Sequence, residues 1–189
     1  DTGGLFVAVA GDDERYIADF PGLCATSGIG VRPVPLNEAR EMEPSLSPRA
    51  IAAYLVPDAS IDPFGLSLQM MVQAERYGAR LVRRTGVVGF ERDGGRIAAV
   101  RLRQSRTGEE RTLGADVVVN AAGAWARGVA QLAGVDVPML YSKGTLVVTH
   151  TRLAHRVLNR LRPPGDADII MPGGTVSIAG TTSLTIDDL

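Results

Sequence analysis

Three short runs of this sequence hold the residues whose types could do chemistry. Lys143, the only lysine, precedes a glycine, and a cation there can bind phosphate or carboxylate, although a solvated surface lysine is the commoner case. A second run ends in three consecutive hydroxyls, Thr181, Thr182 and Ser183, which alone are more typical of capping and turns than of catalysis. Residues 120–123 end an apolar run with small side chains, so a cofactor could approach the backbone there, or a helix could pack closely against it.

The sequence gives little support for a disulfide, a metal site, a catalytic histidine or a glycine-rich phosphate-binding loop. Cys24 is the only cysteine, which excludes a disulfide within the chain and a cysteine-cluster metal site. The two histidines, His150 and His155, have neither zinc-ligand spacing nor an obvious acidic partner. Both are expected to be structural or exposed, and no metal site is expected. The run Gly28-Ile29-Gly30 has no third glycine and follows no strand, so we do not expect a phosphate-binding loop there.

The composition bounds the class of protein. The chain has 189 residues, of which 45% are hydrophobic and 22% charged, enough for one domain or two small interleaved domains. A formal net charge of -1 argues against a nucleic-acid surface, which needs a basic field. No apolar run is long enough to span a membrane, and no signal peptide is visible. Because the first residue is Asp1 and not Met, we expect a piece of a longer protein.

Hydrophobic spacing and breaker residues predict the elements of the first half. The expected elements are strands at residues 4–10 and 50–56 and helices at residues 14–27 and 38–43. Pro21 should kink or split the first helix, and Asn37 should cap the second. A third helix should begin at Pro63, capped by Asp62, and end at Gly78. Its apolar stripe consists of Phe64, Leu68, Met71 and Val72.

From residue 79 onward the apolar period changes to two. The expected strands of this β-meander are residues 80–84, 87–92, 97–103 and 112–113. The continuously apolar run at residues 115–122 predicts a strand buried on both faces, as in a parallel sheet. The other expected elements are a helix at 125–132 closed by Gly134, strands at 144–149, 169–171 and 175–180, a short helix around 153–160 and a turn at Gly173-Gly174. This mixture predicts an α/β (α+β) fold whose chain leaves one domain, visits another and returns.

Several of these runs together resemble the FAD-dependent glycerol-3-phosphate dehydrogenases, in particular the catalytic subunits of the anaerobic, quinone-linked type. The runs that carry the resemblance are KGTL at residues 143–146, DADIIMPG at 166–173, IAGTTS at 178–183, DPF at 62–64, and VVNAAG at 118–123 followed by Trp125. The resemblance extends over nearly the whole chain from about Asn37 onward. VVNAAG is shared by the wider D-amino-acid-oxidase-like superfamily.

The resemblance implies the domain organisation. Residues 60–140 are expected to form part of an FAD/NAD(P)-binding-type domain, made of a helix, a β-meander and a buried parallel-type strand. Residues 1–59 and 141–189 are expected to form a discontinuous substrate-binding domain with an antiparallel sheet.

The resemblance also implies the site residues. Val87 matches the position whose backbone meets the adenine of FAD. Ala122 and Gly123 match the strand end that approaches the flavin, and Trp125, two residues after Gly123, is a further implied cofactor-binding position. The implied catalytic residues, which match positions lining the cavity between flavin and substrate, are Lys143, Thr181 and Thr182.

The implied activity is oxidation of sn-glycerol 3-phosphate to dihydroxyacetone phosphate, with hydride transfer to FAD and electrons passed to quinone through other subunits. The implied location is the cytoplasm, with peripheral membrane association of the parent complex as an option. The family's Gly-x-Gly-x-x-Gly segment and its arginine-bearing C-terminal segment have no counterpart here, so this piece is expected to hold no FAD and to be inactive alone. Two alternatives stay open: another FAD-dependent oxidoreductase acting on a hydroxy acid or amine, and a non-catalytic binding or assembly module.

Overall fold

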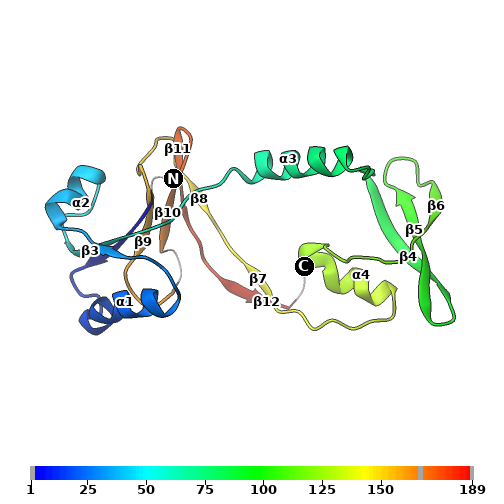
Figure 1. Ribbon diagram of the computed structural model, residues 1–189, viewed down its shortest axis with the longest axis horizontal. Helices are drawn as coiled ribbons and strands as arrows, with labels where there is room; N and C mark the ends of the chain where they lie inside the picture. The colour runs from blue at the N-terminus through cyan, green and yellow to red at the C-terminus, as the bar shows by residue number, and fades with distance from the viewer. Residues whose placement is uncertain (1–2, 166–167, 188–189) are drawn as a thin grey trace. The chain divides into compact units, whose positions relative to one another are not determined.

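The computed structural model describes residues 3–165 and 168–187, which form two compact units. Unit 1 consists of Asp1–Asp62 and Ser142–Leu184, and unit 2 consists of Pro63–Tyr141 and Thr185–Leu189 (Figure 1). The first two residues of the run DADIIMPG lie outside the described residues.

Unit 1 is built on a mixed sheet of seven strands with the order β2-β3-β1-β9-β10-β11-β8. Strand β1 is antiparallel to β3 and parallel to β9, and the remaining pairs from β9 to β8 are antiparallel. Residues from both halves of the chain are therefore needed to complete one sheet. The strands are β1 Gly4–Val9, β2 Arg32–Pro33, β3 Ala50–Val56, β8 Val147–Val148, β9 Val157–Arg160, β10 Ile169–Gly173 and β11 Val176–Gly180.

Helices cover both faces of β1, because the side chains of a strand alternate between its two faces. Leu5 and Val7 belong to a buried cluster with Ala39 of α2 (Leu36–Met42). Ala8 belongs to a second cluster with Phe20 of α1 (Glu14–Thr26). Figure 1 shows α1 and α2 on opposite sides of β1 and β3. This double cover explains why both Leu5 and Ala8 are 0% exposed.

The two helices of unit 1 differ from the predictions in detail. α1 runs through Pro21 without a break, so of the two predicted effects of this proline the split does not occur. A proline removes one helix hydrogen bond, and the burial of Phe20 and Cys24 nearby offsets that loss. α2 begins at Leu36 directly after a proline, so the prediction that Asn37 caps it was wrong. Asn37 lies inside the first turn of the helix instead.

The expected short helix around residues 153–160 is wrong, because buried polar side chains hold this segment in another conformation. The fully buried Ser177 hydroxyl accepts the N–H of Leu153 at 2.9 Å. Both carboxylate oxygens of Glu43, a residue 1% exposed, accept the N–H of His155 at 3.0 Å. Backbone donors bound to side chains in this way do not continue into a helix, so the chain goes on as β9 beside β1.

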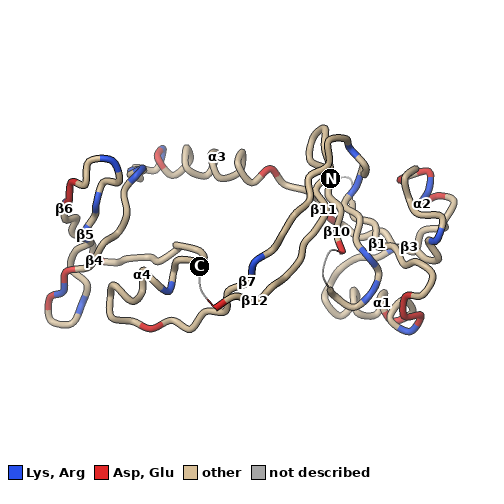
Figure 2. The backbone as a smooth tube through the Cα atoms, turned by 180° about the vertical axis from the view of Figure 1, so that it is seen from behind, with Lys and Arg blue, Asp and Glu red and all other residues tan. Residues whose placement is uncertain are grey.

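Unit 2 begins with the helix and the β-meander that the sequence predicts. α3 (Pro63–Arg76) starts directly after Asp62, and Gly78 follows its end with a φ of 91°. Figure 2 shows charged residues only near the ends of α3, in agreement with the sequence. The meander consists of β4 Thr85–Asp93, β5 Arg96–Gln104 and β6 Glu110–Gly114, all antiparallel. These elements support the predicted mixed α/β class.

The rest of unit 2 leads back to unit 1 along the chain. A single 3-10 turn, Gly123–Trp125, precedes α4 (Ala126–Leu132), and Gly134 follows α4 with a φ of 66°. β7 (Tyr141–Lys143) and β12 (Leu184–Ile186) then form a sheet of two strands. None of the helices within residues 3–165 and 168–187 is long and apolar enough to cross a membrane.

Three expected strands differ from the structure. Residues 115–122 form no strand, and Val117 and Val119 are 81% and 82% exposed. A strand buried on both faces needs neighbouring strands and covering layers, which unit 2 does not provide for this run among the described residues. Residues 80–84 are also irregular and end at Arg84 with a φ of 54°. The strand expected at residues 144–149 is reduced to the two residues of β8.

Candidate functional site

Two segments that hold the predicted catalytic residues lie side by side in unit 1. The N–H of Thr145 donates to Oγ1 of Thr182 at 3.0 Å. In the other direction, the N–H of Thr182 donates to the carbonyl oxygen of Thr145 at 3.4 Å. These reciprocal bonds bring the loop after Lys143 beside Thr181 and Thr182. Their catalytic roles stay predictions.

Glycine at two positions makes this close approach possible. A Cβ on Gly144 would clash with the Thr181 hydroxyl and lie 3.0 Å from the carbonyl oxygen of Thr182. A Cβ on Gly180 would clash with the side chain of Leu146. At Gly144 the backbone of Thr182 leaves no room for a side chain, whereas at Gly180 the flexible end of Leu146 could move aside.

Sequence reasoning missed the hydroxyl of Ser142 and its pairing with Ser183. The Oγ atoms of Ser142 and Ser183 are hydrogen-bonded at 2.8 Å, although the two residues are 41 positions apart in the sequence. Ser142 directly precedes Lys143, and Ser183 directly follows Thr182. Nothing in the local sequence pattern indicates such a long-range pair, so no signal short of the fold would have found it.

The chemistry of this cluster suits an anionic ligand that carries hydroxyl groups. Lys143 is exposed, and its ammonium group has no hydrogen-bond or ion-pair partner within the part of the chain that the structure describes. The Thr182 hydroxyl accepts one N–H and keeps its own proton to donate. The Thr181 hydroxyl donates to the carbonyl oxygen of Thr182 at 3.0 Å and keeps its lone pairs to accept.

Two of the predicted cofactor-binding residues line one pocket in unit 2. Val87 of β4 and Trp125 border an open pocket of about 590 Å³, together with one face of α4. The indole of Trp125 is 69% exposed, so its ring is available to a planar ligand. The other lining residues are Arg127, Gly128, Val129, Gln131, Leu132, Tyr141 and Asp187.

Ala122 and Gly123 lie just before this pocket and are not among its lining residues. The side chain of Asn120 holds their turn, because its Nδ2 donates to the carbonyl oxygen of Ala126 at 2.8 Å and its Oδ1 accepts the N–H of Ala122 at 3.3 Å. Gly123 has a φ of 57°, and open space lies where a Cβ would stand. The backbone at Gly123 is therefore open to close approach by a ligand.

Arg127 is a second residue that sequence reasoning missed. Its guanidinium pairs with Asp136 at 3.4 Å, while its Nε atom is buried and has no hydrogen-bond partner among the described residues. A buried donor without a partner is unusual in proteins and can be satisfied by a ligand. The pocket therefore combines an exposed aromatic ring with a cationic group.

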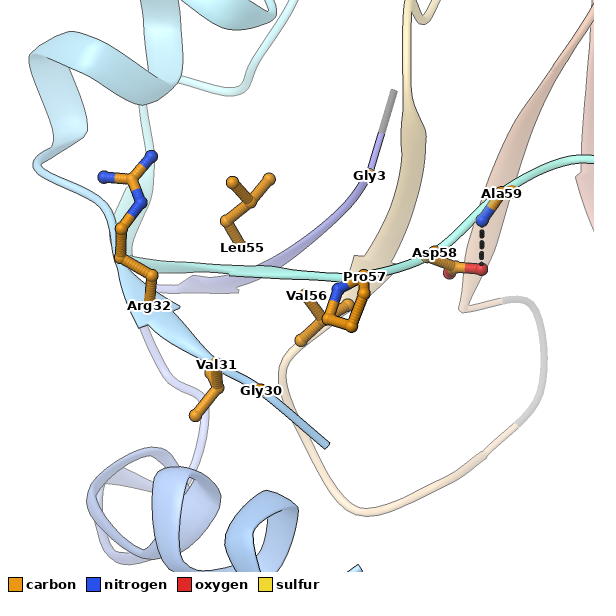
Figure 3. Close-up of a pocket in the computed structure, with 9 residues that line it drawn as sticks. All are labelled: Gly3, Gly30, Val31, Arg32, Leu55, Val56, Pro57, Asp58 and Ala59. Atoms are coloured by element: carbon orange, nitrogen blue, oxygen red, sulfur yellow. Dashed lines mark hydrogen bonds between the residues drawn. The ribbon is translucent and has the colours of Figure 1, made fainter. Parts of the chain in front are cut away.

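A larger pocket, of about 810 Å³, lies at the ends of β1, β2 and β3 in unit 1 and contains none of the predicted site residues (Figure 3). Arg32 is one of the lining residues, and its guanidinium pairs with Glu38 at 2.9 Å. Asp58 accepts the N–H of Ala59 at 2.8 Å. Arg32 and Asp58 are the charged residues of this lining, and neither was predicted as a site residue.

Comparison with known proteins identifies the family. The family model described as FAD dependent oxidoreductase matches residues 1–188. The chain belongs to this family. One subunit of the anaerobic glycerol-3-phosphate dehydrogenase from Escherichia coli (strain K12) is 41% identical over 98% of this chain, and its counterpart from Haloferax volcanii is 38% identical over 99%. The crystal structure of L-proline dehydrogenase from P. horikoshii covers 99% of the chain with a TM-score of 0.79 at 24% identity, which shows the shared fold.

This member of the FAD-dependent oxidoreductase family spans about a third of the length of its curated relatives. It covers 34% of the E. coli relative and 33% of the H. volcanii relative. It also covers 50% of the L-proline dehydrogenase chain.

The residues present fit part of an FAD molecule. The exposed Trp125 ring and the unpartnered Nε of Arg127 suit a planar, anionic dinucleotide, and the backbone at Gly123 is open. β4 is an edge strand of its sheet within the described residues, so part of its backbone is free to bind an adenine edge. The glycine-rich nest that usually binds the pyrophosphate is not among these 189 residues. No group of three or more His, Cys, Asp and Glu side chains within the described ranges could hold a metal ion.

Proposed function

We propose that this chain is the part of an FAD-dependent dehydrogenase that helps to hold FAD and presents the substrate, sn-glycerol 3-phosphate, for oxidation to dihydroxyacetone phosphate. The observation that carries the proposal is the 41% identity to one subunit of an anaerobic glycerol-3-phosphate dehydrogenase, over 98% of this chain. Because the identity extends over both units, a shared reaction is the simplest explanation. We further propose that residues 60–140 serve FAD and that residues 1–59 and 141–189 serve the substrate.

In this proposal each cluster has its own task. When bound, FAD supplies the acceptor for the hydride that leaves C2 of the substrate. Val87, Ala122, Gly123 and Trp125 contact the cofactor through their backbone and through the indole ring. On the substrate side, the Lys143 ammonium pairs with an oxyanion of glycerol 3-phosphate. The hydroxyls of Thr181 and Thr182 orient it by hydrogen bonds.

We also propose the partners. The anaerobic glycerol-3-phosphate dehydrogenase relatives are named as subunits of their enzymes, so further subunits would accompany this chain and pass the electrons to quinone. The parent complex would act in the cytoplasm, attached peripherally to the inner membrane. Reconstitution with quinone and membrane fractions tests this part separately from the substrate.

The test of the site is Lys143→Ala in an FAD-loaded enzyme that contains this sequence. Loss of a charge-assisted contact shielded from water is worth about 1.5–3 kcal/mol. We therefore expect kcat/KM for glycerol 3-phosphate to fall roughly tenfold to hundredfold. Steady-state kinetics with an artificial electron acceptor, compared between glycerol 3-phosphate and an amine substrate, measures both the loss and the substrate class.

Two variants control this experiment. Thr181→Val keeps the shape but removes a hydroxyl, so a smaller loss than that of Lys143→Ala is expected. Arg101→Ala removes an exposed arginine that pairs with Glu110 at 3.3 Å on the meander, and it should leave kcat/KM unchanged. Wild-type kinetics in Lys143→Ala, with FAD bound, would make Lys143 a surface lysine.

A further inference from the structure

The segment that carries Lys143 is linked to its neighbour on both sides of the lysine. Ser142, one residue before, is hydrogen-bonded to Ser183 at 2.8 Å. Thr145, two residues after, exchanges hydrogen bonds of 3.0 Å and 3.4 Å with Thr182. Lys143 and Gly144 therefore lie between two cross-links.

The pair of serines does little for stability by itself. Both residues are exposed, and water replaces an exposed hydroxyl–hydroxyl bond at small loss. The pair does fix one position of the β7 segment against the residues that lead into β12. The pair therefore affects the position of this segment more than the stability of the protein.

The position of this segment matters because Lys143 and Gly144 directly follow Ser142. The lysine side chain is a flexible stem with a point charge, so the position of its backbone decides where the ammonium can reach. The glycine after it adds backbone freedom and does not restrain the lysine. The pairing of β7 with β12 and the Thr145–Thr182 bonds also hold this segment, and the Ser142–Ser183 pair is the side-chain contact directly before Lys143.

We infer that Ser142 and Ser183 are positioning residues, whose hydroxyl pair sets the place from which Lys143 presents its ammonium group to an oxyanion. The identity of that oxyanion as glycerol 3-phosphate rests on the proposed function. The positioning itself is a property of this chain. Neither serine contacts the ligand in this inference, because their hydroxyls are directed at each other.

The single lysine makes the inference directly measurable in this protein. Reductive methylation with an isotopically labelled reagent gives Lys143 a resolved NMR signal, and its loss in Lys143→Arg distinguishes it from the signal of the terminal amine. The test variants are Ser142→Ala and Ser183→Ala, each without any ligand. The rescue variants, Ser142→Thr and Ser183→Thr, keep a hydroxyl at the same position.

The matched control is Ser47→Ala. The Ser47 hydroxyl, also exposed and in unit 1, accepts the N–H of Arg49 at 3.2 Å, so its loss removes a comparable bond far along the chain from Lys143. We expect the Lys143 signal to shift in both test variants and in the double variant by no more than in either single one. The threonine variants should restore it, and Ser47→Ala should leave it in place.

Each outcome decides the inference. A Lys143 signal that stays in place in Ser142→Ala and Ser183→Ala overturns it, as does an equal shift in Ser47→Ala. Addition of glycerol 3-phosphate or inorganic phosphate to the unmutated protein tests the proposed function separately. If the ligand leaves the signal unchanged while the serine variants move it, the positioning stands and the substrate assignment fails. If both respond, the ligand affinity should fall on the order of tenfold in the alanine variants.

Discussion

A single buried hydroxyl, that of Ser177, satisfies two backbone donors in unit 1. It accepts the N–H groups of Leu153 at 2.9 Å and Ala154 at 3.3 Å. In Ser177→Ala both donors lose their partner inside the protein. Because an unsatisfied buried group costs its full desolvation free energy, we expect the free energy of unfolding to fall by about 1–3 kcal/mol. Urea denaturation followed by circular dichroism measures the change.

Ser47→Ala is the control for this prediction as well. Ser47 is exposed and accepts the N–H of Arg49. Water can replace its hydroxyl, so the expected change is within about 0.5 kcal/mol. Equal destabilisation by both substitutions would show that burial of Ser177 is not the cause.

The ion pair of Asp12 should make the stability of the protein depend on pH. Its carboxylate accepts the N–H of Val9 at 2.7 Å and pairs with Arg160 at 2.6 Å. Burial alone would raise the pKa of Asp12, but the bonds from Val9 and Arg160 outweigh it, so the pKa lies below its ordinary value. A carboxyl whose pKa is lowered by folding stabilises the protein fully above its unfolded pKa, about 3.9, and less as the pH falls through the folded pKa.

The measurement compares wild type with Asp12→Asn from neutral to strongly acidic pH. We expect the variant to be less stable than the wild type at neutral pH, and the difference to shrink below about pH 4. Urea midpoints at each pH give the two curves. Parallel curves would mean that Asp12 does not contribute to the acid dependence.

Helices and turns whose signals lie in neighbouring residues could be predicted from the sequence, whereas elements held by distant residues could not. α3 and the turn after β10 were predicted because their signals, a proline at the helix start and a glycine pair, lie within a few residues; the turn itself lies at Gly174-Thr175, one residue later than predicted. β9 was predicted as a helix because the group that holds the segment before it, Glu43, is 112 positions away from His155. The residues at 115–122 were predicted as a buried strand from apolarity alone.

In the candidate site too, local sequence patterns did not indicate the contacts between distant residues. Lys143, Thr181 and Thr182 were named from a resemblance, and composition alone favoured a solvated lysine and a turn. The contacts that bring their segments together come from Thr145, Ser142 and Ser183, whose partners lie 37 and 41 positions away. Such pairs exist only in the folded sheet. A single sequence carries no local pattern for them.

The exposed apolar side chains of α3 should promote self-association of the protein. Its apolar side chains are widely exposed, with Phe64 at 85%, Leu68 at 66% and Met71 at 46%. A helix with this composition is usually covered, and exposed apolar patches promote association. We expect the protein to self-associate as its concentration rises, and the double substitution Leu68→Glu with Met71→Glu to reduce this association. Sedimentation velocity over a range of concentrations measures it.

Leu113→Glu controls for the added charge. Leu113 of β6 is 55% exposed but lies outside α3. If one glutamate there reduced association as much as the pair on α3, a general effect of net charge would explain the result. A concentration-independent sedimentation coefficient in the unmutated protein would contradict the prediction outright.

At the scale of the whole molecule, unit 1 depends on contacts between distant parts of the sequence. β1 pairs with β9, and the Asp12–Arg160 ion pair joins residues 148 positions apart. Between these two parts the chain forms unit 2. Sheets that need such long-range pairing form slowly, because the loop must close before the contacts are made.

The 189 residues contain no Gly-x-Gly-x-x-Gly, the loop that with a helix N-terminus usually cradles the pyrophosphate of a dinucleotide. The pocket beside Val87 and Trp125 offers a ring surface and one guanidinium, which leaves the two phosphates without their backbone donors. We therefore expect purified protein of this sequence to carry no FAD. The visible absorbance of oxidised flavin after purification measures this, with a longer relative of the family as the positive control. A stoichiometric flavin band would show that these residues alone bind the cofactor, and Trp125→Ala would then test whether this pocket holds it.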